Sequence, residues 1–386
     1  MTPMKVLHVY RTYYPDPPGG LQEAIRQICI STQAHGVQNT VFTLSPAPWP
    51  KVIERPEAQV VRCRSWAAPA SCDLGALDAV YTFRQLAKQA DVIHYLFPWP
   101  YADVLRCLAP SKPSVLTYIS DIVRQRWLGA LYRPLMWRTL RSMDAIVSNA
   151  PAYAAGSSVL SDASLQPLIR KIPLGIDQNS YAMEPETRIF DKLGVSTEEP
   201  FLLFVGVLRY YKGLHVLLDA FQHVKGCVVI AGAGPEEAAL KAQALALGVK
   251  NVVFAGHVSD AEKMALLKAC RGLVLPSHLR SEAYGMVLVE ASMMGKPMVT
   301  CEIGTGTSFV NQDSETGFVV PPESPMALVD ALNKLLTDQA LASRYGRAAR
   351  QRYEALFSGP ALGRAYSELY RDVLRQHPVS KKYAPR

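Results

Sequence analysis

Two glutamates, Glu282 and Glu290, have the residue type and the spacing in this 386-residue chain that point most directly to chemistry. The residues after Glu282 have the pattern of a helix, which ends at the segment Gly295-Lys-Pro. We therefore expect Glu282 in the loop before the helix and Glu290 about two turns inside it. The N–H groups at the start of this helix would be unpaired and would attract an anion such as phosphate; they belong to Tyr284, Gly285, Met286 and Val287.

Carboxylates beside an anion site make chemical sense when the ligand carries hydroxyl groups as well as phosphate. A nucleotide sugar carries both, so the pair predicts a site for such a donor. Taken alone, two glutamates at this spacing are more often solvated surface charges. The neighbouring residues decide between these two interpretations.

The segments around the pair resemble the family 4 retaining glycosyltransferases, whose E-x7-E motif falls on Glu282 and Glu290. The resemblance covers nearly the whole chain and is strongest from Phe201 to Pro322. It implies that Glu282 contacts the donor sugar and that Glu290 contacts the ribose. The segments that carry it are Ser281-Glu-Ala-Tyr-Gly, Glu290-Ala, Gly295-Lys-Pro, Gly304-Thr-Gly-Thr and Thr316-Gly-Phe-Val-Val-Pro-Pro.

The same resemblance implies the GT-B fold, an α/β architecture of two Rossmann-like, doubly wound domains facing a central cleft. Helical and strand patterns alternate along most of the chain, which independently favours the α/β class. We expect an N-terminal acceptor domain over residues 1–182 and a nucleotide-sugar donor domain over 183–360. A C-terminal helix within 361–380 is expected to pack back on the first domain.

Further donor contacts follow from the resemblance. Gly19 and Gly20 lie in the loop after the first predicted strand, where a backbone without side chains can approach the diphosphate. Arg209 and Lys212 would bind the diphosphate as cations without carboxylates nearby, and His257 would lie at the nucleotide base. Without the resemblance, the glycines indicate a turn and the cations indicate solvated loop charges.

Three residues of the first domain are candidates for the acceptor or for catalysis. His94 is near the end of a predicted strand, Asp91 to Tyr95, where ligands gather in open α/β sheets; a structural role is the alternative. Asp121 matches a T-Y-H-S-D motif of the family, but Ile119 stands where many members have histidine. We interpret Ile119 as a sign of a deoxy-sugar donor or of impaired catalysis, unless the alignment is shifted at this point.

The segment Ile122 to Met143 alternates arginine with tryptophan and leucine, and Pro134 is expected to divide it into two helical pieces. Such a stretch suits a membrane interface, and an ordinary pair of surface helices is an equal alternative. The formal net charge of +8 indicates an anionic partner: phosphate ligands, an anionic membrane surface or nucleic acid. Nucleic acid ranks last, because no nucleic-acid-binding motif accompanies the charge.

The resulting hypothesis is a metal-independent hexosyltransferase of bacterial polysaccharide or O-antigen synthesis. It would transfer mannose or rhamnose from a GDP-sugar onto a lipid-linked saccharide, with the nucleotide sugar as substrate and no cofactor. No D-x-D motif or histidine cluster is placed for a metal. The alternatives are a nucleotide-sugar epimerase and a catalytically impaired nucleotide-sugar-binding partner. The sequence predicts a cytoplasmic protein, with a peripheral position on the inner face of the plasma membrane left open.

Overall fold

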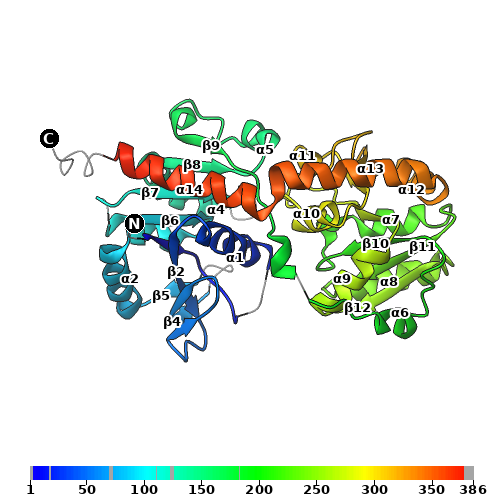
Figure 1. Cartoon of the computed structure of the whole chain (residues 1–386), viewed down its shortest axis with the longest axis horizontal. Coiled ribbons are helices and arrows are strands. Elements are labelled where there is room, and N and C mark those ends of the chain that lie inside the picture. The colour runs from blue at the N-terminus through cyan, green and yellow to red at the C-terminus, as the bar shows by residue number, and fades with distance from the viewer. Residues whose placement is uncertain are drawn as a thin grey trace. The chain divides into compact units, whose positions relative to one another are not determined.

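The computed structural model describes residues 3–16, 19–68, 73–109, 111–121, 126–181 and 183–377, without the side chains of 126–131. The chain forms two compact units: Met1–Asp177 together with Gly359–Arg386, and Gln178–Ser358 (Figure 1). The boundaries expected from the sequence, after 182 and after 360, lie five and two residues further along the chain than those at 177 and 358. None of the helices within the described ranges is both long enough and apolar enough to span a bilayer.

The first unit is built on a sheet in which the described residues form nine strands, in the order β3-β4-β2-β1-β6-β7-β8-β9 with β5 paired to β4. Its neighbouring strands are parallel, except that β3 and β5 run antiparallel to β4. The strands are β1 Met4–Val9, β2 Val37–Ser45, β3 Val52–Glu54, β4 Gln59–Ala67, β5 Leu74–Gly75, β6 Val92–Phe97, β7 Ser114–Tyr118, β8 Ala145–Ser148 and β9 Ile169–Lys171. The helices are α1 Gly20–Gln33, α2 Leu77–Gln89, α3 Pro100–Cys107, α4 Arg126–Arg141, α5 Pro151–Gly156 and α14 Gly359–Gln376.

The second unit has a sheet of six strands among the described residues, all parallel, in the order β12-β11-β10-β13-β14-β15. The order reverses between β10 and β13, and ligands of such sheets bind in the crevice at the carboxyl ends of the strands at this point. The strands are β10 Phe201–Val205, β11 Cys227–Ala231, β12 Val252–Gly256, β13 Gly272–Leu275, β14 Met298–Cys301 and β15 Gly317–Val320. The helices are α6 Arg188–Leu193, α7 Leu214–Ala220, α8 Glu237–Ala246, α9 Asp260–Ala269, α10 Met286–Met293, α11 Thr307–Val310, α12 Pro325–Thr337 and α13 Gln339–Arg352.

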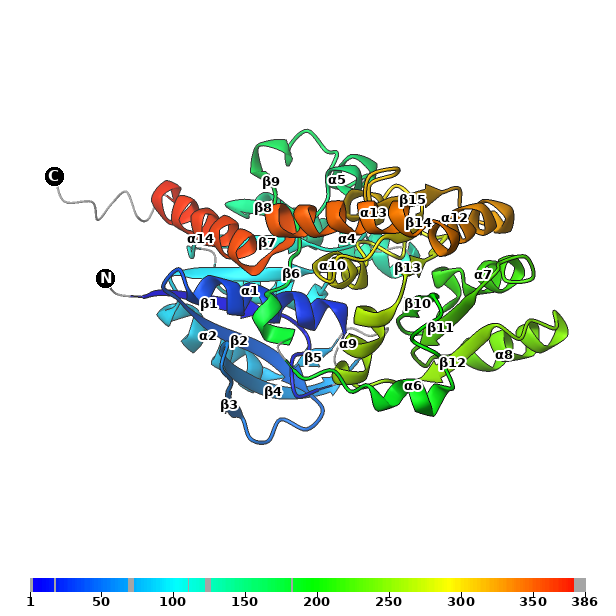
Figure 2. The same ribbon diagram turned by 45° about the vertical axis from the view of Figure 1, so that its right-hand side comes forward.

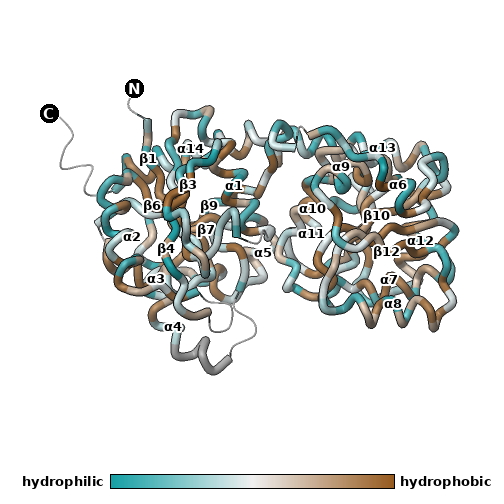
Figure 3. Tube along the Cα trace, turned by 90° about the horizontal axis from the view of Figure 1, so that it is seen from below, coloured by the Kyte–Doolittle hydropathy of each residue, from teal (hydrophilic) through white to brown (hydrophobic). Residues whose placement is uncertain are grey.

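The central strands of both sheets are nearly continuous apolar runs, because helices cover both faces of a parallel sheet. Every residue of β6 and β7 is buried, and so are the first four residues of β10. Figure 3 shows the hydrophobic colouring of the second unit concentrated around β10. This composition is the reason why these strands were readily predicted from the sequence.

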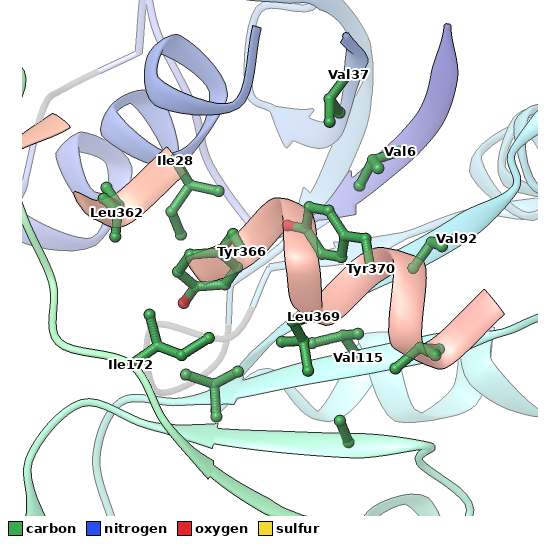
Figure 4. Packing of buried hydrophobic residues seen from close by; sticks show 13 residues of the cluster. Val6, Ile28, Val37, Val92, Val115, Ile172, Leu362, Tyr366, Leu369 and Tyr370 are labelled. Carbon is green, nitrogen blue, oxygen red and sulfur yellow. The ribbon is translucent and has the colours of Figure 1, made fainter. Parts of the chain in front are cut away.

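Helix α14 completes the core of the first unit, and Figure 2 shows it running close to α1 and the sheet of that unit. Apolar residues recur on one face of the helix, which is the pattern of an amphipathic helix packed on a core. Figure 4 shows this face against residues of β1, β6 and β7, including Val6, Val92 and Val115. The face consists of Leu362, Tyr366, Leu369, Tyr370 and Val373.

His94 lies inside β6 and is fully buried, so its interpretation as an acceptor-site residue is wrong. Its Nε2 atom is 2.7 Å from the hydroxyl oxygen of Thr117, and its Nδ1 atom is 2.8 Å from the hydroxyl oxygen of Tyr370. Burial, helped by the neighbouring His8, lowers the pKa of His94 well below its ordinary value. His94 is therefore a neutral core residue that links β6 to β7 and α14.

Residues 126–141 of the segment with alternating arginine and tryptophan form one helix, α4, so the expected division at Pro134 is wrong. Pro134 is exposed within this helix, and its nitrogen cannot donate a helical hydrogen bond. Residues 122–125, with Arg124, lie outside the described residues, as do the side chains of Arg126 and Trp127.

The described part of α4 packs its apolar side chains inward. Met136 and Leu140 are buried, and the Tyr132 hydroxyl donates a hydrogen bond to Asp103 of α3. Arg133 and Arg138 are exposed. Between residues 132 and 141 this helix thus offers the solvent arginines rather than large apolar groups.

The buried hydrogen bond between Tyr370 and His94 generates a stability prediction. In Tyr370→Phe the Nδ1 atom of His94 loses its partner in the core, which costs about 1–3 kcal/mol of unfolding free energy. Urea unfolding measures the loss, with Tyr81→Phe as the control because the side chain of Tyr81 is exposed. Equal stability of the two variants would contradict the role given to this hydrogen bond.

Candidate active site

The parallel strands of the second sheet bring four predicted residues to one edge. Strands β10, β12 and β13 end at Val205, Gly256 and Leu275, and parallel strands have their carboxyl ends on the same edge. The loops that follow carry the predicted donor contacts Arg209, Lys212, His257 and Glu282.

The loops after β10 and β13 lie directly against each other at the point where the strand order reverses. The amide of His278 donates a hydrogen bond to the carbonyl oxygen of Tyr211 at 3.0 Å. Gly213 has a φ of 69°, and a Cβ atom on it would come within 2.1 Å of the carbonyl oxygen of Pro276. Glycine at 213 therefore permits the approach of the two backbones.

This approach brings Lys212 and Glu282 into an ion pair, and the Ser277 hydroxyl donates a second hydrogen bond to Glu282 at 3.3 Å. The expectation that Lys212 has no carboxylate nearby is wrong, because Glu282 lies beside it. The Glu282 side chain is largely buried, at 8% exposure. Arg209 is exposed, and no ion pair joins it to a carboxylate of the described residues.

Helix α10 starts beside this ion pair. Gly285 precedes it with a φ of 81°, a left-handed conformation that suits glycine. A helix has no internal partners for the N–H groups of its first turn, here including Met286 and Val287, so these groups can receive an anion. The side chain of Tyr284 is buried, so any contact with a bound phosphate would come from its backbone.

Glu290 lies in the second turn of α10 and is 7% exposed. Its Oε1 atom accepts hydrogen bonds from the Tyr181 hydroxyl and from the Lys263 ammonium, each at 2.9 Å. Burial lowers the pKa of Lys263, but the attraction of Glu290 and Asp260 outweighs it and raises the pKa above its ordinary value. Each glutamate of the motif is thus paired with a lysine.

Three residues that contact the glutamates of the motif were not predicted from the sequence: Ser277, Tyr181 and Lys263. Residue types and spacing near the motif contain no signal for Tyr181 and Lys263, which are 109 and 27 positions away from Glu290. Ser277 is only five positions from Glu282, and its place two residues after the end of a buried strand could have identified it.

In the first unit, Asp121 follows β7 and is tied to its surroundings. Its Oδ1 atom accepts hydrogen bonds from the hydroxyl groups of Tyr118 at 2.8 Å and Ser157 at 2.6 Å. Its amide donates to the Tyr153 hydroxyl at 2.6 Å. These bonds fix the loop after β7, and no described residue is bonded to Oδ2.

The other predicted residues of the first unit differ in their exposure. Gly19 and Gly20 are exposed at the start of α1. Ile119 is 9% exposed, and its amide donates to the carbonyl oxygen of Phe97 at 3.2 Å. An apolar side chain suits this buried position.

The cavity found among the described residues lies beside the motif rather than at it, and no metal site is found there. A cavity of about 130 Å³ lies between α7 and α8, next to Arg209, and is lined by neither Lys212 nor Glu282. No three histidine, cysteine, aspartate or glutamate side chains of the described residues form a group that could hold a metal ion.

The ion pair between Lys212 and Glu282 leads to a test by paired substitutions. Glu282→Ala leaves the ammonium of Lys212 mostly buried without its partner, and we expect a loss of about 3 kcal/mol of unfolding free energy. Lys212→Met should cost a similar amount, and the double variant less than the sum of the two. Denaturant unfolding measures all three.

The matched control is the exposed pair of Lys241 and Glu237 on α8, for which Glu237→Ala should cost no more than about 0.5 kcal/mol. A loss at Glu282 as small as the loss at Glu237, or strict additivity of the double variant, would contradict the coupling.

Comparison with known proteins matches both units to glycosyltransferase models. Residues 185–352 match the model described as glycosyl transferases group 1, and residues 19–158 match the glycosyl transferase 4-like domain. The D-rhamnosyltransferase WbpZ of Pseudomonas aeruginosa is 47% identical over 356 residues, which are 92% of this chain and 92% of that protein. The O-antigen chain mannosyltransferase C of Escherichia coli is 40% identical over 372 residues, 96% of this chain and 99% of that protein.

Solved structures share the fold at lower sequence identity. A sucrose-phosphate synthase from Thermosynechococcus elongatus superposes with a TM-score of 0.78 at 22% identity, covering 96% of this chain and 99% of that chain. The Anabaena protein HepE in complex with UDP gives the same TM-score at 20% identity, covering 96% and 100%. Nothing in these similarities favours the alternatives of an epimerase or a catalytically impaired binding partner. The chain therefore belongs to the group 1 glycosyltransferases, family 4-like enzymes of the GT-B fold.

Proposed function

We propose that this glycosyltransferase moves mannose or rhamnose from a GDP-sugar onto a lipid-linked saccharide during bacterial O-antigen synthesis, with retention of configuration. The similarity to a D-rhamnosyltransferase and to an O-antigen mannosyltransferase supports the choice of sugar and of process. One observation carries the proposal: a lysine, a glutamate and the start of a helix lie together where the strand order of the second sheet reverses.

The order of the strands suggests how the donor lies along this edge. The base would lie near His257 after β12, and the diphosphate near Arg209, Lys212 and the first turn of α10. Glu290 would then accept hydrogen bonds from the ribose and Glu282 from the transferred sugar. In the first unit, Gly19, Gly20, Asp121 and Ile119 stay predicted contacts of the donor or acceptor.

The charges of the site suit the departure of a diphosphate. Lys212 would exchange its contact with Glu282 for the β-phosphate, which frees the Glu282 carboxylate for hydroxyl groups of the sugar. Lys212, Arg209 and the amides of α10 would then stabilise the negative charge that develops as the bond between C1 and the phosphate oxygen breaks. The acceptor oxygen forms the new bond to C1 on the same face, and its proton passes to the leaving phosphate.

A donor screen tests this proposal directly. Purified enzyme is incubated with radiolabelled GDP-mannose, GDP-rhamnose, UDP-glucose or UDP-galactose and a synthetic polyprenyl-diphosphate saccharide, and the products are separated and their anomeric configuration determined. We expect transfer from a GDP-sugar with retention, and a loss of about 10²–10³-fold in turnover in Lys212→Met, by analogy with removal of one donor to a developing negative charge. An isomerised nucleotide sugar without transfer would favour an epimerase, and binding without turnover would favour an impaired partner.

We further propose that the protein binds an anionic membrane surface, where a lipid-linked acceptor would reside. Arg133, Arg138 and Arg141 of α4 supply exposed positive charge. A group of large exposed apolar side chains of the first unit lies elsewhere, after β2, near the end of β4, on β5 and on α2, where they would suit the interface between lipid and water. This group, the aromatic rim, consists of Trp49, Trp66, Leu74, Leu77 and Tyr81.

The topology of the first unit brings the rim residues to one edge of the sheet. Parallel strands β2 and β4 end together, with Ser45 opposite Arg64. Strand β5 pairs with the last residues of β4, and α2 begins two residues after it. Basic side chains accompany the apolar groups: the guanidinium of Arg64 lies 5.2 Å from the ring centre of Trp66, and Lys51 contacts α2 at Thr82. Aromatic and basic groups together suit an anionic bilayer.

Flotation with vesicles tests this second proposal. We expect binding to vesicles with anionic lipid, weaker binding as salt rises, and little binding to neutral vesicles, because exposed charges are screened over about 8–10 Å at physiological ionic strength. Leu77→Ser should weaken binding roughly tenfold, since it removes a large apolar group from the interface. The matched control is Leu245→Ser in the second unit, because Leu77 and Leu245 are 85% and 84% exposed. Equal effects of the two substitutions would contradict a role of the aromatic rim.

A further inference from the structure

The carboxylate of Glu290 is held by one of its two oxygen atoms. Oε1 accepts both the Tyr181 hydroxyl and the Lys263 ammonium. No described residue donates to Oε2, and Oε2 is not one of the fully buried polar atoms that lack a partner. The second oxygen therefore reaches solvent and can accept hydrogen bonds from a ligand.

Lys263 and Tyr181 also hold each other in place. The ammonium of Lys263 lies 5.0 Å from the ring centre of Tyr181, close enough for a cation–π interaction. Asp260 accepts a second hydrogen bond from Lys263 at 3.0 Å, which fixes the ammonium from the first turn of α9. Three side chains from three separate segments thus form one cluster: Tyr181 from the 3-10 turn Gln178–Tyr181, Lys263 from α9 and Glu290 from α10.

We propose that Tyr181 and Lys263 are positioning residues that aim the free oxygen of Glu290 at the ribose hydroxyls of the nucleotide. The inference rests on the proposed function, in which Glu290 contacts the ribose. A carboxylate free to rotate loses conformational entropy when it binds a diol, and a preorganised carboxylate has lost it already. The two positioning residues thereby make the enzyme selective for ribonucleotides over deoxyribonucleotides.

Lys263 contributes charge as well as geometry. Its pKa is raised above the ordinary value, so it stays protonated at neutral pH and holds a positive charge beside the Glu290 carboxylate. An ionised carboxylate accepts stronger hydrogen bonds from hydroxyl groups than a protonated one. Arginine at 263 would preserve the charge, whereas methionine would preserve only the length of the side chain.

Calorimetric binding of GDP and of 2′,3′-dideoxy-GDP to the full-length protein tests the proposal, with UDP and 2′,3′-dideoxy-UDP in parallel. The measured quantity is the ratio of the two dissociation constants within each pair. We expect the wild type to bind the ribonucleotide about ten- to a hundredfold more tightly than the dideoxynucleotide. Hydrogen bonds to a charged group are stronger than those between neutral groups. Glu290→Ala should bring the ratio close to one.

The positioning residues are then tested one at a time. Tyr181→Phe and Lys263→Met should each lower the ratio several-fold while leaving the affinity for the dideoxynucleotide unchanged, and Lys263→Arg should restore most of it. If the two residues had a purely structural role, their substitution would weaken the binding of both nucleotides equally. Lys192→Met is the matched control, because Lys192 contacts Glu262 on the same helix, α9, at 3.5 Å and lies outside the cluster.

The outcomes separate this inference from the proposed function. If the wild type prefers ribonucleotides and Glu290→Ala abolishes the preference, but Tyr181→Phe and Lys263→Met retain it in full, the positioning role is refuted while the ribose contact stands. If the wild type shows no preference in either nucleotide pair, the ribose contact of Glu290 is refuted and the positioning role with it. The donor screen continues to test sugar transfer in both cases.

Discussion

The contact between the loops after β10 and β13 is the constraint on which the candidate active site depends. These loops meet because β10 and β13 are adjacent parallel strands at the reversal of the strand order. The close approach at Gly213 then places Lys212 against Glu282, 70 positions apart in the chain. A mostly buried ion pair of this kind is costly to desolvate and adds little net stability. The ion pair keeps a cation and a carboxylate together, and a nucleotide diphosphate sugar would bind to both.

The buried polar side chains have different kinds of partners in the two units. In the first unit, His94, Thr117, Tyr366 and Tyr370 satisfy one another inside the core and tie α14 to the sheet. In the second unit, Glu282 and Glu290 each have a lysine partner and lie near the surface at the carboxyl edge or on α10. Closed networks of this kind stabilise a fold, whereas a network with one open acceptor can also bind a ligand. The burial of a polar residue alone therefore does not distinguish a structural role from a functional one.

Most of the elements could be predicted from the sequence. The predicted strand Asp91 to Tyr95 overlaps β6, Val92–Phe97, because the central strands of a covered parallel sheet are nearly continuous apolar runs. The strands β3, β5 and β9 were not predicted, because a segment of two or three residues is too short for a pattern to be recognised; β15 was not predicted either. The unbroken helix α4 was not predicted, because a proline inside a helix usually kinks or ends it.

The sequence by itself determined the glycosyltransferase family, through the spacing of Glu282 and Glu290 and the glycines around them, because these depend on residues close together in the chain. The tertiary structure decided which partner each polar group has and whether it meets solvent. His94 is bonded to a tyrosine 276 positions away, and Glu290 to one 109 positions away. Hydrogen bonds and burial of this kind arise when distant segments pack, so local residue patterns contain no record of them.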